Sequence, residues 1–218
     1  MTLSPEEVTR KKQWRTRLLA ERTEKTEGTR SAEAAALRTS ILEHIGGSSP
    51  SGSSPAGRAP GDSAPGNSAP VTVCAYVPIG SEPGSPDLLD GLREYGCRVL
   101  LPIVVGAEPL EWAEYTGPES LRSARYGLLE PAGTHLGQTA LGDADVVLVP
   151  ALAVDRNGTR LGRGGGHYDR SLPLADSRAQ LIAVVSDHEF VDHLPGEAHD
   201  VRMSAVLTPE RGVVPLPL

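Results

Sequence analysis

Five short apolar runs, each bounded by turn-forming residues, follow one another through the last two thirds of the chain. They are rich in β-branched residues and lie at 71–77, 98–105, 144–154, 180–186 and 203–208. Runs of this length and composition are typical of strands buried in a sheet. Helix-like segments at 86–96 and 168–176 alternate with them. The alternation predicts an α/β fold, a mostly parallel sheet flanked by helices.

Two helices are predicted before the first of these strands. Ser4, Pro5 and Glu7 supply a capping hydroxyl, a proline at the first helical position and a carboxylate three residues after the cap. They indicate a helix from residue 4 to about residue 27. Ser31 opens a second helix, whose apolar residues recur every three or four positions and which we expect to end before the glycine pair at 46–47.

Residues 46–70 have a composition that cannot form a core, since all but three of these 25 residues are Gly, Ser, Pro or Ala. We expect a disordered insertion, and an inert insertion is favoured over a tether that binds a partner. The predicted organisation is a single domain, 1–218, with N-terminal helices at 4–45, the insertion at 46–70 and an α/β body at 71–218.

Composition excludes several classes of protein. The formal charge of −7 argues against broad binding to nucleic acid or to an anionic membrane. Two cysteines are too few for a disulfide framework or a four-cysteine zinc site. The N-terminus has no signal-peptide pattern, and no apolar run approaches the roughly 20 residues that span a bilayer. We therefore expect a soluble cytoplasmic protein, whose oligomeric state stays open.

A glycine- and arginine-rich stretch follows the third strand. Residues 156–170 hold four arginines, five glycines and one carboxylate. Ligands of parallel sheets gather beyond the carboxyl ends of the strands, where glycine amides, arginines and a helix start suit a phosphate. Neither G-x-G-x-x-G nor the P-loop motif fits the register. A solvated surface loop is the alternative.

The residues of this stretch carry a family resemblance. GTRLGRGGGHYDR, at 158–170, resembles the signature of the 5-formyltetrahydrofolate cyclo-ligase family, G-x-R-L-G-R-G-x-G-[YF]-Y-D. Other segments agree in order: KKQWR, AYVPIGSEP, YGLLEP, DVVLVPALAVD and HDVRMSAVLTP. The resemblance implies a three-layer, Rossmann-like architecture of the NagB/RpiA/CoA-transferase-like type.

The resemblance also implies a reaction. ATP and Mg²⁺ would drive the conversion of 5-formyltetrahydrofolate to 5,10-methenyltetrahydrofolate, through phosphorylation of the formyl oxygen, ring closure by N10 and release of ADP and phosphate. Two alternatives stay open: a noncatalytic protein that binds a phosphate, a nucleotide or RNA on this scaffold, and an enzyme of unrelated reaction such as a sugar-phosphate isomerase. Nucleotide dependence separates the isomerase from the cyclo-ligase.

Site residues follow from the resemblance, position by position. For ATP it implies Lys11, Lys12, Arg15, Arg160, Leu161, Gly162, Arg163, Gly164, Gly165, Gly166, His167 and Tyr168. For the folate it implies Val77, Glu82, Arg163, Gly164, Gly165, Gly166 and His167. Arg163 is the expected catalytic residue, in contact with the transferred phosphoryl group, and Asp169 and Asp200 are the expected Mg²⁺ carboxylates.

Several of these residues also have a plainer interpretation. The basic residues at 11–15 suit a solvated helix face, Glu82 an ordinary loop, and Asp169 a helix N-cap. His167 departs from the family pattern, which has Tyr or Phe there. Trp112 and Tyr126 are candidates for an aromatic wall against the folate, although core packing is favoured for both.

Overall fold

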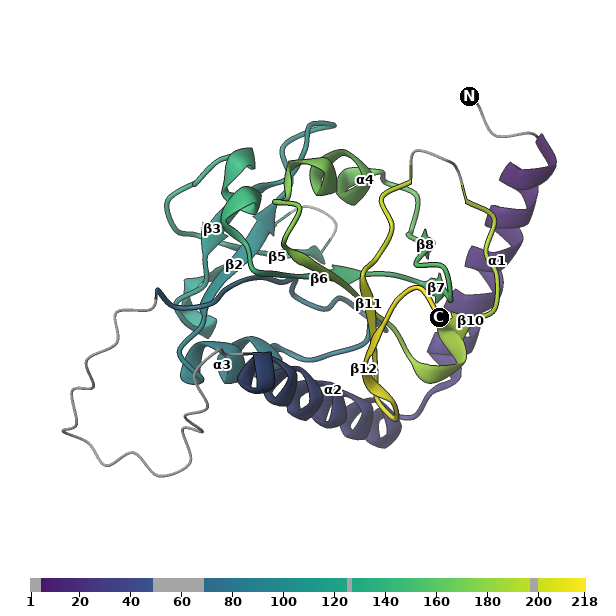
Figure 1. The fold of residues 1–218 in the computed structure, drawn as a ribbon, viewed down its shortest axis with the longest axis horizontal. Coiled ribbons are helices and arrows are strands. Elements are labelled where there is room, and N and C mark those ends of the chain that lie inside the picture. The colour runs from purple at the N-terminus through teal and green to yellow at the C-terminus, as the bar shows by residue number, and fades with distance from the viewer. Residues whose placement is uncertain (1–4, 49–68, 125–126, 197–199) are drawn as a thin grey trace.

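The computed structural model describes residues 5–48, 69–124, 127–196 and 200–218 (Figure 1). The α-helices are α1 (Pro5–Glu24), α2 (Glu27–Ser48), α3 (Pro86–Glu94) and α4 (His167–Ser171). Turns of 3₁₀ helix lie at Pro118–Ser120, Gln138–Asp143, Leu172–Leu174 and Asp187–Glu189. The strands are β1 (Thr72–Cys74), β2 (Arg98–Ile103), β3 (Glu111–Glu114), β4 (Leu121–Ser123), β5 (Leu129–Pro131), β6 (Val146–Pro150), β7 (Ala153–Asp155), β8 (Arg160–Leu161), β9 (Gln180–Val184), β10 (Phe190–Val191), β11 (Ala205–Thr208) and β12 (Gly212–Pro215).

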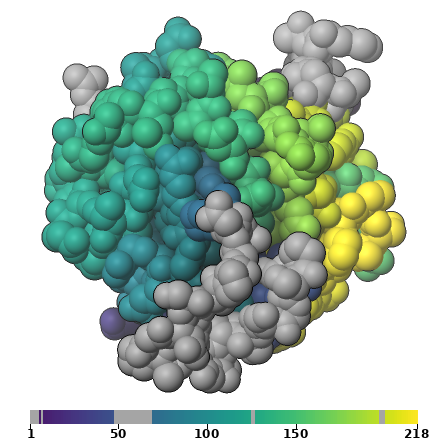
Figure 2. Space-filling model, turned by 60° about the vertical axis from the view of Figure 1, so that its left-hand side comes forward, coloured from purple at the N-terminus to yellow at the C-terminus, as the bar shows by residue number. Residues whose placement is uncertain are grey.

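A seven-stranded sheet forms the centre of the fold, in the order β12-β11-β9-β6-β1-β2-β3. The five inner strands are parallel, and the two outermost strands, β12 and β3, pair antiparallel. The prediction of a mostly parallel sheet is confirmed. In Figure 2 the teal residues that include β2 and β3 and the yellow residues of β11 and β12 lie on opposite sides of one face, as this order requires.

Both faces of the sheet are covered, which explains the continuous apolar runs of its strands. Neighbouring residues of one strand point to opposite faces, so Val73 packs toward α2 and α3 while Cys74 packs toward the other side. α2 and α3 lie below the sheet in Figure 1, and α4 lies above it. The helices, the sheet and the opposite layer form the predicted three-layer arrangement.

Two smaller sheets accompany the central one, and one of them corrects a predicted strand. The run at 144–154 forms two strands, because β6 ends at Pro150 and the chain then enters a three-stranded sheet in the order β10-β7-β8. Proline has no amide to donate to a ladder, so a strand tends to end there. The remaining sheet pairs β4 with β5.

The helix boundaries also differ from the prediction. α2 begins at Glu27 rather than Ser31, and the Thr26 hydroxyl accepts a hydrogen bond from the Thr29 amide ahead of it. α2 also continues through Gly46, where an added Cβ would lie 2.5 Å from the Tyr95 hydroxyl. This glycine therefore permits a close approach rather than ending the helix. The predicted disordered insertion falls mainly on residues 49–68, outside the described residues.

Candidate active site

The glycine–arginine stretch is carried by the β7–β8 hairpin, which a buried carboxylate shapes. Asp155 is fully buried, and its Oδ1 accepts hydrogen bonds from the amides of Asn157 (2.9 Å) and Thr159 (2.8 Å). Its Oδ2 accepts one from the Leu194 amide at 3.0 Å. A carboxylate with three backbone donors fixes the turn that precedes the loop and ties it to the segment after β10.

Gly158 at the tip of the hairpin is required by close packing. Its φ is +79°, and an added Cβ would lie 2.4 Å from the Met203 carbonyl oxygen. The Met203 amide donates to the Gly158 carbonyl at 2.8 Å. Only glycine allows the hairpin to meet this neighbouring backbone segment.

Beyond the hairpin, the loop borders a cavity of about 230 Å³ at the carboxyl edge of the central strands. Apolar side chains such as Val77, Ile79 and Leu110 line one part, and the loop lines another. The lining of the cavity includes these predicted site residues: Val77, Glu82, Arg160, Gly162, Arg163, Gly164, Gly165, Gly166, His167, Tyr168 and Asp169. The structure thus brings most of the predicted ATP and folate residues to one cavity.

Arg163 and Glu82 meet across this cavity although they lie 81 positions apart in the sequence. The Arg163 Nε donates to Glu82 Oε1 at 2.9 Å, and Glu82 Oε2 accepts a hydrogen bond from the Ile79 amide at 3.1 Å. The Glu82 side chain is 9% exposed and that of Arg163 is 45% exposed. Glu82 therefore anchors Arg163 through its Nε, and within the described part of the chain the two terminal nitrogens of Arg163 have no hydrogen-bond partner.

Helix α1 supplies basic residues from the side. The Arg15 Nε donates to the Gly162 carbonyl at 2.9 Å, and the Lys11 Nζ lies 4.0 Å from Asp200 Oδ2. Lys12 is exposed. Arg15 therefore contacts the loop itself, Lys11 lies near Asp200, and the exposure of Lys12 agrees with a solvated helix face.

The two predicted metal carboxylates have different surroundings. Asp169 lines the cavity and accepts a hydrogen bond from Arg160, whereas Asp200 lies outside the cavity lining. Gly166 occupies the N-cap position of α4, so the N-cap interpretation of Asp169 is wrong. Among the described residues, no group of three or more His, Cys, Asp or Glu side chains could hold a metal ion.

The predicted aromatic, imidazole and leucine side chains differ in whether they reach the cavity. His167 lines the cavity, with its Nδ1 3.3 Å from Arg170 Nη2. Burial raises the pKa of Tyr168, whose hydroxyl has no partner within the described part of the chain. Leu161 is buried beneath the loop, outside the cavity. Trp112 is fully buried in the core, so the favoured core-packing interpretation is confirmed for it, and Tyr126 lies outside the described residues.

Two charged residues of the cavity were missing from the sequence prediction. Glu130 of β5 lines it and accepts a hydrogen bond from the Val104 amide at 3.0 Å. Arg22 of α1 lines it from a position 1% exposed to solvent. The sequence offered one signal for Arg22: it follows Leu18 by four residues, on the helix face that also carries Arg15.

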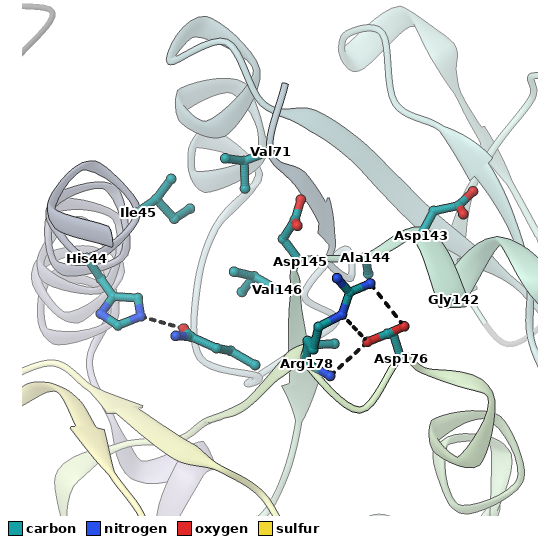
Figure 3. A pocket seen from close by; sticks show the side chains of 12 residues that line it. His44, Ile45, Val71, Gly142, Asp143, Ala144, Asp145, Val146, Asp176 and Arg178 are labelled. Carbon is teal, nitrogen blue, oxygen red and sulfur yellow. Dashed lines mark hydrogen bonds and ion pairs between the residues drawn. The ribbon is translucent and has the colours of Figure 1, made fainter. Parts of the chain in front are cut away.

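A second, larger cavity of about 610 Å³ lies at the opposite edge, where β1, β6 and β9 begin (Figure 3). Its charged side chains include Asp143, Asp145 and Asp176, and its arginine, Arg178, is hydrogen-bonded to Asp176. An acidic lining with a paired arginine does not suit an anionic ligand. The phosphate-binding features therefore belong to the smaller cavity.

Within the described ranges, no helix combines the length and the hydropathy needed to cross a membrane.

Comparison with known proteins matches residues 67–209 to the model of the 5-formyltetrahydrofolate cyclo-ligase family. The chain is 56% identical over 150 residues to 5-formyltetrahydrofolate cyclo-ligase of Mycolicibacterium smegmatis, a match that covers 66% of this chain and 77% of that protein. The chain belongs to the 5-formyltetrahydrofolate cyclo-ligase family. It is therefore an enzyme, a ligase that acts in the conversion of 5-formyltetrahydrofolate to 5,10-methenyltetrahydrofolate.

Other relatives agree with this assignment. The cyclo-ligase of Escherichia coli K12 is 32% identical over 143 residues, 64% of this chain and 79% of that protein. The NMR structure of 5,10-methenyltetrahydrofolate synthetase from Aquifex aeolicus aligns with a TM-score of 0.68 at 25% identity, over 94% of this chain and 92% of that one. The fold resemblance thus extends to the N-terminal helices, which the family model does not cover.

Proposed function

We propose that this cyclo-ligase uses ATP and Mg²⁺, with the loop at 160–168 as its phosphate site and the adjoining cavity as its folate site. One observation supports this proposal most directly. The arginine expected at the phosphoryl group and the carboxylate expected at the pterin line one cavity and are hydrogen-bonded to each other at 2.9 Å. Phosphoryl donor and formyl acceptor would then meet at Arg163.

The chemistry explains why a phosphoryl donor is needed. The carbon of a formamide is a poor electrophile because nitrogen donates into the carbonyl, and its oxygen is a poor leaving group. Transfer of the terminal phosphoryl group of ATP to that oxygen releases ADP and corrects both faults. N10 then bonds to the formyl carbon, the carbon–oxygen bond breaks, phosphate departs, and N10 loses its proton.

The chain's own residues would contribute positioning and charge. Arg163 keeps its two terminal nitrogens for phosphoryl oxygens, since only its Nε contacts Glu82 among the described residues. Arg15 and Lys11 would add positive charge beside the loop, and the glycine amides would donate to the phosphates. α4 has only five residues, so the glycine amides and the arginines would contribute more to phosphate binding than the N-terminus of α4.

Glu82 would serve the folate as well as Arg163. Each of its carboxylate oxygens accepts one protein hydrogen bond, from Arg163 and Ile79, and retains a lone pair. An aminopyrimidine edge offers the donors that such a carboxylate accepts. Val77 and Ile79 also line the cavity, and their side chains suit the apolar faces of the pterin.

Carboxylate oxygens are the protein ligands that Mg²⁺ prefers, usually one or two of them, with phosphates and water completing its shell. Asp169 fits this requirement at the rim of the cavity, and Asp200 is the second candidate. When bound, the ion would neutralise charge on the phosphates.

The test is turnover by the purified protein. 5-Formyltetrahydrofolate and Mg-ATP are mixed with it, and the methenyl chromophore and ADP are measured together. Arg163→Ala should remove turnover, whereas the control Arg178→Ala, at an exposed arginine of the other cavity, should retain it. ATP binding without turnover by the folded wild-type protein would favour the noncatalytic alternative, and turnover without ATP would refute the proposal.

A further inference from the structure

One face of α1 carries four residues that all contact the region of the site. Lys11, Arg15, Leu18 and Arg22 follow at steps of four, three and four, so a helix places them in one stripe. Lys11 lies by Asp200, Arg15 donates to the loop, and Leu18 is fully buried in a cluster with Leu161. Arg22 is the last member of the stripe, and unlike Lys11 and Arg15 it is a charged residue that is buried.

Arg22 joins three parts of the molecule. Its Nε donates to Glu189 Oε1 at 2.6 Å, and its Nη2 donates to Glu189 Oε2 at 2.9 Å and to the Ala151 carbonyl at 2.6 Å. Ala151 lies between β6 and β7, where the chain leaves the central sheet for the small sheet that bears the loop. The next amide, that of Leu152, donates to the Leu161 carbonyl of β8 at 2.7 Å.

Glu189 is held as firmly as its partner. It is fully buried, and its Oε2 also accepts a hydrogen bond from the Ser186 amide at 2.8 Å, just after the end of β9. Arg22 and Glu189 are 167 positions apart, yet both charges are removed from water. Two apolar side chains of similar volume would commonly be as stable as such a pair, so stability alone does not account for it.

We propose that Arg22 and Glu189 are a positioning pair that holds α1 in register with the glycine–arginine loop and thereby sets the affinity for ATP. The pair acts through Arg15 and Lys11, which lie on the same face two and three turns earlier along the helix. Arg22 ties the last part of the stripe to Ala151, and the neighbouring Leu152 is hydrogen-bonded to Leu161 at the start of the loop. This inference rests on the proposed function, in which the loop binds ATP.

The test separates positioning from stability. Arg22→Met alone leaves the Glu189 carboxylate buried without its cation, and its melting temperature should fall by roughly 10 °C. The double variant Arg22→Met/Glu189→Met removes both charges and should melt within about 3 °C of the wild type. Its KM for ATP should nevertheless rise about tenfold or more, because the tie to Ala151 is lost and misplaced contacts weaken binding steeply. Its KM for the folate should change much less.

Two further variants complete the design. Arg17→Met/Glu21→Met removes an exposed pair on the same helix, 57% and 40% exposed, and should leave both KM values unchanged. Arg22→Lys keeps the charge but cannot donate to both Glu189 oxygens and to Ala151 together, so it should fold and still raise the KM for ATP. If the double variant does not fold, Arg22→Lys is used to test the proposal in its place.

The outcomes are distinct. A KM for ATP within twofold of the wild type in the double variant, or in Arg22→Lys if only that variant folds, would overturn the positioning role. A rise confined to the folate KM would also overturn it, since it would indicate direct contact with that substrate. Absence of ATP-dependent turnover in the wild-type protein would instead refute the proposed function, and this inference with it.

Discussion

Replacing Gly158 with alanine tests how tightly the hairpin beneath the loop is packed. At φ +79° an alanine costs about 1 kcal/mol more than glycine. The new Cβ would also lie 2.4 Å from the Met203 carbonyl oxygen and 3.1 Å from the Met203 nitrogen. Both atoms belong to the backbone, so a change of side-chain rotamer cannot relieve the contact.

The magnitude follows from the displacement that is needed. The Gly158 and Met203 backbones would have to separate by nearly 1 Å. This would break the hydrogen bond from the Met203 amide to the Gly158 carbonyl, worth about 1 kcal/mol, and disturb the packing around it. With the backbone conformational cost, a destabilisation of about 3–4 kcal/mol is expected. For a chain of this size that corresponds to a fall in melting temperature of roughly 10 °C.

Gly106→Ala is the matched control. Its φ is +57°, yet an added Cβ would meet nothing within 4 Å, so this variant isolates the conformational cost. Thermal unfolding followed by circular dichroism should show a loss for Gly158→Ala about three times that for Gly106→Ala. Equal losses in the two variants would refute the packing argument.

Three further predictions concern catalysis, the hairpin and the buried thiols. Arg163→Ala should lower kcat by about 10³- to 10⁵-fold. Its melting temperature should stay within about 4 °C of the wild type, because the Arg163 side chain is 45% exposed and Glu82, which loses this partner, lines the cavity and keeps the Ile79 amide; a small loss of kcat would exclude contact of Arg163 with the phosphoryl group. Asp155→Asn should cost about 2–3 kcal/mol in urea unfolding, since an amide nitrogen then faces backbone donors, and a cost under about 0.5 kcal/mol would contradict this. Burial raises the pKa of Cys97 to about 11, and that of Cys74 further. Unfolded thiols lose their protons near pH 8.5, so the native state retains protons that the unfolded state has lost, and the free energy of unfolding should fall between pH 9 and 11. Cys97→Ala should make that fall shallower, and an unchanged slope would count against the burial effect.

The parallel core was predictable from the sequence because its strands are buried on both faces. β1, β2, β6, β9 and β11 all lie within the predicted apolar runs. The edge strands escaped prediction for the opposite reason. β3 is Glu-Trp-Ala-Glu, and its two ends are less buried than its middle, so it lacks a continuous apolar run. Its place was settled by pairing with β2, which a local pattern does not encode.

Glycine was the least reliable boundary signal. Gly46 lies inside α2, where the close approach of Tyr95 explains it. Gly158 does lie at a turn, and it also meets the Met203 backbone closely. A glycine can thus mark a turn, a close contact or both, and only the neighbouring elements distinguish these cases.

The candidate site divides in a similar way. The loop at 158–170 was recognisable because its residues are contiguous, and Glu82 entered through the family resemblance. The pairing of Arg22 with Glu189 spans 167 positions. The sequence places Arg22 on the helix face of Leu18 and Arg15 but does not indicate its partner, and an arginine on a helix ordinarily indicates a solvated face. Its burial follows from the docking of α1 on the small sheet, which a single sequence does not reveal.

The central claim is tested most directly by the stoichiometry of the reaction. ADP and 5,10-methenyltetrahydrofolate would be measured in the same samples, with limiting 5-formyltetrahydrofolate and excess Mg-ATP. We predict one ADP for each methenyl product, with no ADP formed when the folate is omitted. Methenyl product without ADP, or ADP release that continues after the folate is consumed, would contradict the proposed coupling of phosphoryl transfer to ring closure.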